Sequence, residues 1–332
     1  MATITCRRLS ICGQRRNSQC VSYGVDKTVK LEVNGTHQRL RLCAARAGLP
    51  PVLIVQAGPG FPLLNEAAKF QQRLQLEQSF LAVYWDQRGC GQTSLRDTQG
   101  VSLKAQVDDL CFVVRWLKAE TGQKAVVLGI SLGATIALQA AAHAADSIKA
   151  LVAVSIDADT TSSDASAFSF LQERAISPDN RKMARLVKKL GAPPYTAPTS
   201  FQLRARLLTE LGAIEHGKRF GELLRGLLYS LIRTYGWLGA ARTLRNMNAI
   251  QRKMLPELAT LNLFANWPRR AVPIHYIFGE SDPLIPASLI QKVLSTVTHD
   301  DTVTSLPNVG HMAHFDEPTV VRSIIAQAHS IV

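Results

Sequence analysis

Short apolar runs alternate with amphipathic segments along most of this chain. Residues 52–55 and 125–128 are continuous apolar runs, which are typical of strands buried on both faces. After Ser102, a plausible N-cap, apolar residues recur at helical spacing. The predicted strands are residues 28–33, 36–43, 52–55, 80–85, 125–128, 149–155, 272–278 and 302–306. The predicted helices are residues 63–76, 102–120, 134–145, 286–294 and 318–331.

This alternation predicts an α/β fold with a mostly parallel central sheet and helices on both faces. The two-residue sequence Asn34-Gly35 separates the first two strands and indicates a β-hairpin. Residues 158–270 contain no convincing strand and predict an α-helical cap, or lid, inserted between two strands. The expected organisation is therefore an N-terminal extension of residues 1–25, a core of residues 26–157 and 271–332, and a cap of residues 158–270.

Basic residues are concentrated in two parts of the chain, whose net charge is +13. Residues 160–270 hold 18 Lys and Arg against 7 Asp and Glu, and residues 1–25 hold four Arg and no acid. The remainder is nearly neutral. This distribution indicates a separate basic layer rather than a uniformly basic nucleic-acid binder, and no nucleic-acid-binding module is recognisable.

The N-terminal extension lacks the apolar core of a secretory signal, so we expect a disordered segment, with an organelle-targeting peptide as the alternative. The six cysteines form no CxxC pair, which predicts neither a zinc site nor a disulfide framework. Reduced thiols are typical of the cytosol, and we expect a cytoplasmic protein without a metal or an organic cofactor.

A serine lies at the centre of Gly129-Ile130-Ser131-Leu132-Gly133, between a predicted strand and a predicted helix. A serine at the apex of a strand–turn–helix is the nucleophile elbow of serine hydrolases. Glycines two residues before and after it let the strand and the helix approach without Cβ clashes. We expect Ser131 to be a nucleophile and the amide of Leu132 to point at the developing oxyanion. The alternative is a glycine-rich connection with an idle serine.

A nucleophilic serine needs a base and a group that orients the base. His311 lies just after the last predicted strand, and loops at the carboxyl ends of parallel strands carry catalytic groups. His314 is the main alternative base. Asp282 follows another predicted strand and lies between the serine and the histidine in chain order, so it is the expected acid. Glu280 and Asp157 are alternative acids, and Asp282 could instead cap a helix.

The second oxyanion donor should come from the loop after an earlier strand. The loop Gln56-Ala57-Gly58-Pro59-Gly60 follows a buried strand. The amide of Gly58 can approach a substrate closely, whereas Pro59 has no N–H to offer. A tight turn with no further role is the alternative interpretation.

The elbow, the loop after residue 55 and two further motifs resemble those of the α/β-hydrolase superfamily, and within it the proline iminopeptidase-like branch. The loop Gln56-Ala57-Gly58-Pro59-Gly60 is similar to the HGGPG motif of the branch. The segment Trp85-Asp86-Gln87-Arg88-Gly89-Cys90-Gly91-Gln92-Thr93 resembles its W-D-Q-R-G-x-G-x-S motif. Gly310-His311 followed by Asp316-Glu317-Pro318 is similar to its G-H-x-x-x-x-E-x-P ending.

The resemblance extends over about residues 28–157 and 271–330, and it implies an α/β-hydrolase core. It implies a triad and an oxyanion hole formed by Ser131, Asp282, His311 and the amides of Gly58 and Leu132. It also implies that Asp86 and Arg88 are structural and brace loops beside the oxyanion turn. Read from the residues alone, these two side chains are expected to form a buried charge pair.

The chain departs from the branch in two motifs. The branch has His and Gly where this chain has Gln56 and Ala57, and Gly-Gly-Ser-Trp-Gly where this chain has residues 129–133. Its aminopeptidases hold the free amine of the substrate with carboxylates of the cap. The sequence does not map these carboxylates onto Glu173, Glu210, Glu215, Glu222 or Glu257. Because the cap is basic, we expect a serine hydrolase that cleaves a small or acyl ester, amide or lactone.

Three alternatives stay open. One is a proline iminopeptidase-like aminopeptidase that acts on a short peptide. Another is a non-catalytic binding protein on the same fold. The third is a membrane-associated protein, because Leu223 to Tyr235 form a basic amphipathic helix that can lie on an anionic membrane surface. For this helix we favour the interpretation that its apolar stripe covers the site and its arginines are solvated.

Overall fold

The computed structural model describes residues 24–91, 100–176 and 181–330. Within these residues, eight strands form one sheet in the order β1-β2-β4-β3-β5-β6-β7-β8. β1 pairs with β2 and β2 with β4 in antiparallel fashion, and the other neighbours are parallel. The strands are β1 (Val25–Val33), β2 (Thr36–Ala44), β3 (Pro51–Val55), β4 (Leu81–Asp86), β5 (Ala125–Ile130), β6 (Ile148–Val154), β7 (Ile274–Gly279) and β8 (Thr302–Leu306). The predicted, mostly parallel sheet is confirmed.

Helices follow most of the parallel strands. In the described residues they are α1 (Ala67–Leu74), α2 (Leu103–Thr121), α3 (Leu132–Ala141), α4 (Thr160–Ala175), α5 (Arg181–Leu190), α6 (Pro198–Glu210), α7 (Phe220–Leu258), α8 (Ala287–Leu294), α9 (Ala313–Asp316) and α10 (Pro318–Ser330). Two short 3₁₀ helices, η1 (Leu76–Gln78) and η4 (Leu263–Asn266), complete the order.

The central strands are buried on both faces, which explains their continuous apolar sequences. Successive residues of a strand point to opposite faces. Leu53 and Val55 of β3 therefore join one core cluster with residues of α2 and α3. Val52 and Ile54 join a second cluster with residues of α1 and α10. Helices thus cover both faces of the sheet, as the sequence predicts.

Two local predictions are confirmed in detail. Asn34 and Gly35 form the turn between β1 and β2 with φ angles of 45° and 75°, the left-handed conformation that a tight hairpin requires. At the start of α2, the Ser102 side chain accepts a hydrogen bond of 3.1 Å from the amide of Ala105. This bond satisfies one of the helix amides that have no partner within the helix.

The helix predicted for residues 63–76 is shorter than expected. It begins at Ala67 and ends at Leu74. The amides of Leu63 and Leu64 both donate to the Asp86 carboxylate, at 2.7 and 2.9 Å. This long-range contact holds the preceding residues in a turn, and it explains why helical periodicity placed the start too early.

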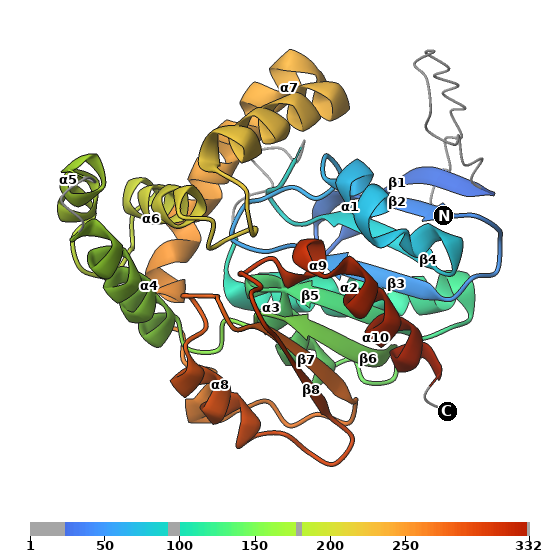
Figure 1. Ribbon diagram of the computed structural model, residues 1–332. Helices are drawn as coiled ribbons and strands as arrows, with labels where there is room; N and C mark the ends of the chain where they lie inside the picture. Colours follow the sequence, from blue (N-terminus) through green and yellow to red (C-terminus); the bar gives the residue numbers. More distant parts are fainter. Residues whose placement is uncertain (1–23, 92–99, 177–180, 331–332) are drawn as a thin grey trace.

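Between β6 and β7 the chain forms α4, α5, α6 and α7, which we call the helical insertion. Figure 1 shows these helices above and to the left of the sheet, on the side away from the carboxyl terminus. Across the described residues, no helix combines the length and the apolar composition needed to cross a membrane. The expected domain limits stay a prediction, and most of the N-terminal extension, residues 1–23, lies outside the described residues.

Candidate functional site

Ser131 lies at a sharp turn between β5 and α3. Its φ and ψ angles are 52° and −120°, a conformation that non-glycine residues rarely adopt. The Ser131 amide donates to the carbonyl oxygen of Val154 at 2.8 Å, which fixes the turn to β6. A Cβ atom at Gly129 would overlap the backbone of Ala134, and one at Gly133 would overlap the carbonyl oxygen of Val55. The two glycines are therefore required by the close packing of strand, turn and helix.

Two loops at the carboxyl ends of β7 and β8 bring Asp282 and His311 together. The Nδ1 atom of His311 lies 2.7 Å from Oδ2 of Asp282, and both side chains are buried. The other carboxylate oxygen, Oδ1, accepts a hydrogen bond of 2.9 Å from the Leu284 amide. A Cβ atom at Gly279 would overlap the carbonyl oxygens of Val309 and Gly310, so this glycine lets the two loops approach.

This geometry can orient an imidazole for proton transfer. A carboxylate that accepts from Nδ1–H holds the neutral ring in the tautomer whose Nε2 is free to accept a proton. Of the alternative acids, Glu280 is exposed and accepts a hydrogen bond of 3.1 Å from the Ser305 hydroxyl. Asp157 accepts from the hydroxyls of Thr160 and Ser163, and burial raises its pKa.

Ser131 and His311 line a common cavity with a volume of about 1530 Å³. Gly58 and Leu132 line the same cavity. Gly58 has a φ of 69°, and a Cβ atom there would collide with the Phe61 ring. The Leu132 amide is the first of α3, and amides of a helix's first turn have no partner within the helix. Both residues therefore border the same cavity as Ser131, and backbone amides are the kind of group that can bind an oxyanion.

His314 is poorly suited to act as the base. Its ring stacks on Phe70 at a centroid distance of 5.3 Å, and its Nδ1 has no hydrogen-bond partner. Burial, followed by the charge of Lys69 and by His311, holds its pKa well below the ordinary histidine value. His314 therefore packs as a neutral ring on the cavity wall, three residues from His311.

The expected charge pair between Asp86 and Arg88 is wrong, although both side chains are buried. Arg88 instead binds Asp109 of α2 through two hydrogen bonds of 2.7 and 2.8 Å. Asp86 accepts from the amides of Leu63 and Leu64 and, at 2.7 Å, from the Tyr235 hydroxyl. Burial raises the Asp86 pKa, and these three bonds oppose that shift.

Asp86 thus links the loop before α1 to α7 instead of pairing with Arg88. The partner of Arg88, Asp109, lies 21 residues further along the chain, and no local sequence pattern indicates that pairing. Gln92 and Thr93 of the same motif lie outside the described residues.

A polar cluster on the cavity wall was not predicted. Glu215, in the loop after α6, is buried and forms an ion pair of 2.5 Å with Lys69 of α1. Glu66 lies beside them, and burial raises its pKa while Lys69 lowers it in part. All three residues line the cavity. The sequence holds no sign of this cluster, because Lys69 and Glu215 are 146 residues apart.

Of the five glutamates considered for the cap, Glu215 and Glu222 line the cavity. Glu257 instead accepts a hydrogen bond from the Leu103 amide at the start of α2. Among the residues that the structure describes, no group of three His, Cys, Asp or Glu side chains could hold a metal ion.

Comparisons with known proteins agree with this architecture. The sequence model of the alpha/beta hydrolase family matches residues 50–324. A probable aminopeptidase, YbaC of Bacillus subtilis strain 168, is 23% identical over 309 residues, which cover 90% of this chain and 94% of that protein.

Two solved structures share the fold at low sequence identity. VinJ superposes with a TM-score of 0.66 and 17% identity, over 94% of this chain and all of that one. The proline iminopeptidase-related protein TTHA1809 of Thermus thermophilus has a TM-score of 0.60 and 18% identity, over 92% of this chain and 97% of that one. The family match spans most of the described core, and the chain belongs to the alpha/beta hydrolase family.

Proposed function

We propose that this hydrolase is a serine hydrolase that cleaves an ester, amide or lactone through an acyl-enzyme. The observation that carries the proposal is the 2.7 Å contact between His311 and Asp282 in the same site as a strained Ser131. In this proposal Ser131 is the nucleophile, His311 is the general base and Asp282 orients the imidazole. The amides of Gly58 and Leu132 form the oxyanion hole.

The reaction would proceed in two halves. The Ser131 Oγ attacks the substrate carbonyl carbon while its proton passes to Nε2 of His311. The tetrahedral oxyanion accepts hydrogen bonds from the Gly58 and Leu132 amides. Its collapse breaks the bond to the leaving group, which takes the proton from His311. Water then attacks the acyl-enzyme with His311 again as base, and the acid product leaves with Ser131 regenerated.

The cavity supports a substrate with a sizeable acyl or amine portion. Its volume of about 1530 Å³ exceeds the roughly 300–1,000 Å³ of pockets that hold drug-sized ligands. Apolar side chains of the helical insertion contribute to its wall, among them Leu203, Leu208, Leu223 and Leu227. The insertion would therefore act as a cap that selects the substrate, while the loops of the sheet supply the chemistry.

An aminopeptidase activity is the second candidate, and the buried Glu215 favours it. A free amine in the cavity would find the carboxylates of Glu215 and Glu66 within a low-dielectric wall, where charge pairing is strong. The basic cap is the reason for expecting a different substrate, but its Lys and Arg side chains are mostly exposed on the insertion. The relative named as a probable aminopeptidase fits the same interpretation.

Labelling with a fluorophosphonate probe tests the proposal. We expect an adduct on Ser131 in the wild type and none in Ser131→Ala. Ser305→Ala, which changes an exposed serine on β8, is the matched control and should label fully. A folded wild-type protein that takes up no probe would contradict the serine-hydrolase proposal and favour a non-catalytic binding protein on this fold.

Substrate comparison separates the two candidate activities. Proline arylamide and its N-blocked form differ only at the amine, so an aminopeptidase cleaves the first alone. Glu215→Gln should then raise KM for the free amine without changing hydrolysis of a neutral p-nitrophenyl ester. Equal rates on the free and the blocked amide would exclude the aminopeptidase.

A further inference from the structure

Helix α7 exposes an unusual number of large apolar side chains. Five of the eight large exposed apolar residues among those described belong to it. The helix is broken at Gly236, whose φ and ψ are 71° and 173°, and Trp237 and Leu238 follow the break with 77% and 86% exposure. We call the following residues the α7 surface: Leu224, Leu228, Tyr229, Trp237 and Leu238, with the exposed arginines Arg219, Arg225, Arg233, Arg242 and Arg245.

The apolar face of the first half of α7 extends further along the helix than the protein covers. Leu231 and Tyr235 are buried, and Leu227 and Ile232 pack against the same core cluster. Leu224 and Leu228 lie one turn apart on this same face, nearer the start of the helix, yet each keeps more than a third of its surface in solvent. Single exposed apolar residues are ordinary, whereas neighbouring ones such as Trp237 and Leu238 can form a patch of the kind that marks an interaction surface.

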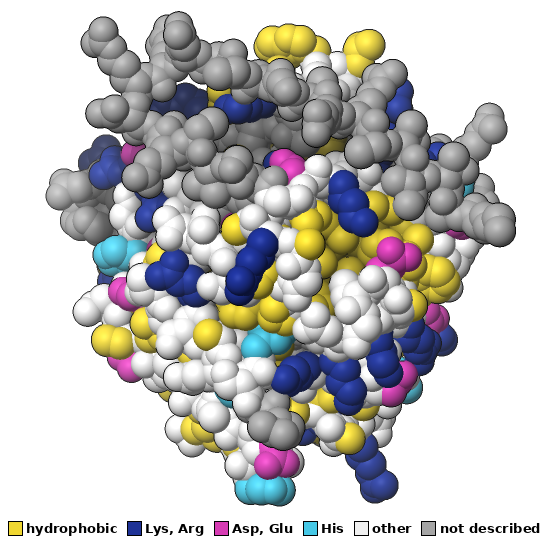
Figure 2. All heavy atoms as spheres, turned by 90° about the vertical axis from the view of Figure 1, so that its right-hand side faces the viewer, with side chains coloured by type: hydrophobic (Ala, Val, Ile, Leu, Met, Phe, Trp, Pro, Cys, Tyr) yellow, Lys and Arg dark blue, Asp and Glu magenta, His cyan; other side chains and the backbone are white. Residues whose placement is uncertain are grey.

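The group lies at an extremity of the molecule. α7 forms the top of Figure 1, and apolar side chains (yellow) reach the upper edge of Figure 2 at the same height. A cluster at this place can meet a flat, extended partner without interference from the sheet.

The charges around these residues restrict the partner. From Lys218 to Arg245, α7 and the residues just before it carry six basic side chains and one acid, Glu222. A second copy of this chain would bring the same excess of positive charge. The N-terminal residues 1–23 hold four arginines and no acid, so they too are electrostatically unfavourable occupants. An anionic surface is the complementary partner.

The cavity opens along the same helix. Leu224, Tyr229 and Arg233 line the cavity that Ser131 and His311 also line. These three side chains are also exposed, so a partner bound to the α7 surface would lie beside the cavity that holds the candidate site.

We propose that the α7 surface binds the surface of an anionic lipid bilayer. The aromatic and aliphatic side chains enter the interface between headgroups and acyl chains, where tryptophan is favoured. The arginines stay at the level of the anionic headgroups. No residue of this surface takes part in the proposed reaction chemistry, so binding does not depend on the proposed hydrolase activity.

Sedimentation with lipid vesicles tests this inference. Wild-type protein should bind vesicles that contain phosphatidylglycerol, bind phosphatidylcholine vesicles weakly, and lose most of its binding in high salt. Trp237→Ser combined with Leu238→Ser should lower the partition coefficient about tenfold or more. Each of Arg225→Gln, Arg233→Gln and Arg242→Gln should lower it about fivefold.

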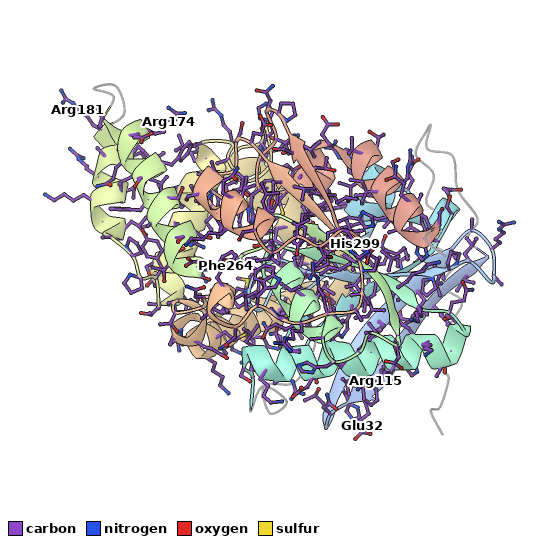
Figure 3. The ribbon with its side chains drawn as sticks, turned by 90° about the horizontal axis from the view of Figure 1, so that it is seen from below. Glu32, Arg115, Arg174, Arg181, Phe264 and His299 are labelled. Carbon is purple, nitrogen blue, oxygen red and sulfur yellow. The ribbon has the colours of Figure 1, made fainter. Side chains whose placement is uncertain are left out.

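Two controls isolate the α7 surface. Ile176 is 79% exposed at the end of α4, in a part of the insertion whose outer tip carries Arg174 and Arg181 (Figure 3). Ile176→Ser removes a comparable apolar side chain and should bind like the wild type. Ser131→Ala should also bind fully, so a failed hydrolase proposal and a failed membrane proposal give different results.

Three results would overturn the inference. One is the absence of binding to anionic vesicles by a folded wild-type protein. Another is equal binding by the wild type and the Trp237→Ser, Leu238→Ser variant. The third is a dimer in light scattering that this double variant converts to a monomer, which would assign the surface to a second copy of the chain.

Discussion

The two walls of the candidate site differ in how tightly their residues are packed. On the sheet side, Ser131 and His311 follow β5 and β8, and glycines such as Gly133 have no room for a Cβ atom. On the insertion side, Gly221 and Gly226 of α7 have open space at that position, and large apolar side chains stay exposed. The first wall therefore holds one geometry, whereas the second can change its surface without disturbing the fold.

This difference suggests a division of roles. A reaction that depends on hydrogen bonds needs side chains held within tenths of an ångström, which only a closely packed frame provides. Selection of a substrate or a surface depends on the shape and charge of a wall that tolerates substitution. The residues of the proposed chemistry lie on the packed side. The cavity wall proposed to select the substrate and the α7 surface both belong to the insertion.

Of the changes proposed here, Asp282→Asn on the packed side should have the largest effect, and the effect is on catalysis. An amide can force the wrong tautomer on His311, and kcat should fall by about 10⁴ with little change in KM. The measurement is steady-state hydrolysis of a p-nitrophenyl ester. Glu280→Gln, an exposed neighbour and the alternative acid, should retain the wild-type rate. Similar rates for Asp282→Asn and the wild type would remove Asp282 from the proposed triad.

Breaking one ion pair in each region should give unequal losses of stability. Arg88→Met leaves the buried Asp109 carboxylate without its cation and should lower the free energy of unfolding by about 3–5 kcal/mol. Lys218→Met removes an exposed pair with Glu222 on the insertion and should cost about 0.5 kcal/mol or less. Urea unfolding of both variants checks this. Equal losses would show that burial does not distinguish the two pairs.

Replacing a glycine by alanine should affect stability in opposite directions in the two regions. Gly133→Ala places a methyl group against the Val55 carbonyl oxygen and should destabilise the protein by about 1–3 kcal/mol. Gly226→Ala adds a methyl group in open space inside α7 and should stabilise that helix by about 0.5–1 kcal/mol. Thermal unfolding measures the first and amide hydrogen exchange along α7 the second. A stabilised Gly133→Ala would contradict the close packing of the elbow.

A further expected effect concerns the dependence of stability on pH. The buried His314 has a pKa well below its ordinary value, whereas in the unfolded chain it takes up a proton below about pH 6.5. The unfolded state then binds more protons, so stability is present above that pH and falls as the pH drops. One histidine contributes at most about 1.4 kcal/mol per pH unit.

Thermal unfolding across this range provides the measurement. His314→Leu should flatten the decline at acid pH, and the exposed His216→Leu should not. A variant curve parallel to that of the wild type would show that other groups cause the acid sensitivity. His329, whose burial lowers its pKa to about 4, is the next group to replace.

Features that depend on neighbours in sequence were predicted well. The Asn34-Gly35 turn and the Ser102 cap are each complete within four residues, so their chemistry is visible in the sequence. The elbow belongs to this class, because both glycines and the serine lie within five residues. The ends of predicted strands indicate Asp282 and His311, and in the structure Oδ2 of Asp282 lies 2.7 Å from Nδ1 of His311.

Features that depend on distant partners were missed or assigned wrongly. The expected partner of Arg88 is Asp86, two residues away in the sequence, but in the structure Arg88 binds the carboxylate of Asp109 on α2. The start of α1 was placed too early because Asp86 holds the preceding amides from a different strand. The pairing of Lys69 with Glu215 joins the first helix to the insertion, and periodicity carries no information about it.

The sequence by itself determined the fold class, the alternation of strands and helices and the serine elbow, because these follow from local propensity and the period of apolar residues. Only the tertiary structure decided which buried charges meet, which glutamates face the cavity and which face of α7 remains in solvent. These outcomes depend on the packing of elements that are far apart in the chain. A buried charged or polar group that loses its partner carries a large desolvation penalty, so each such group keeps the partner that the packing provides.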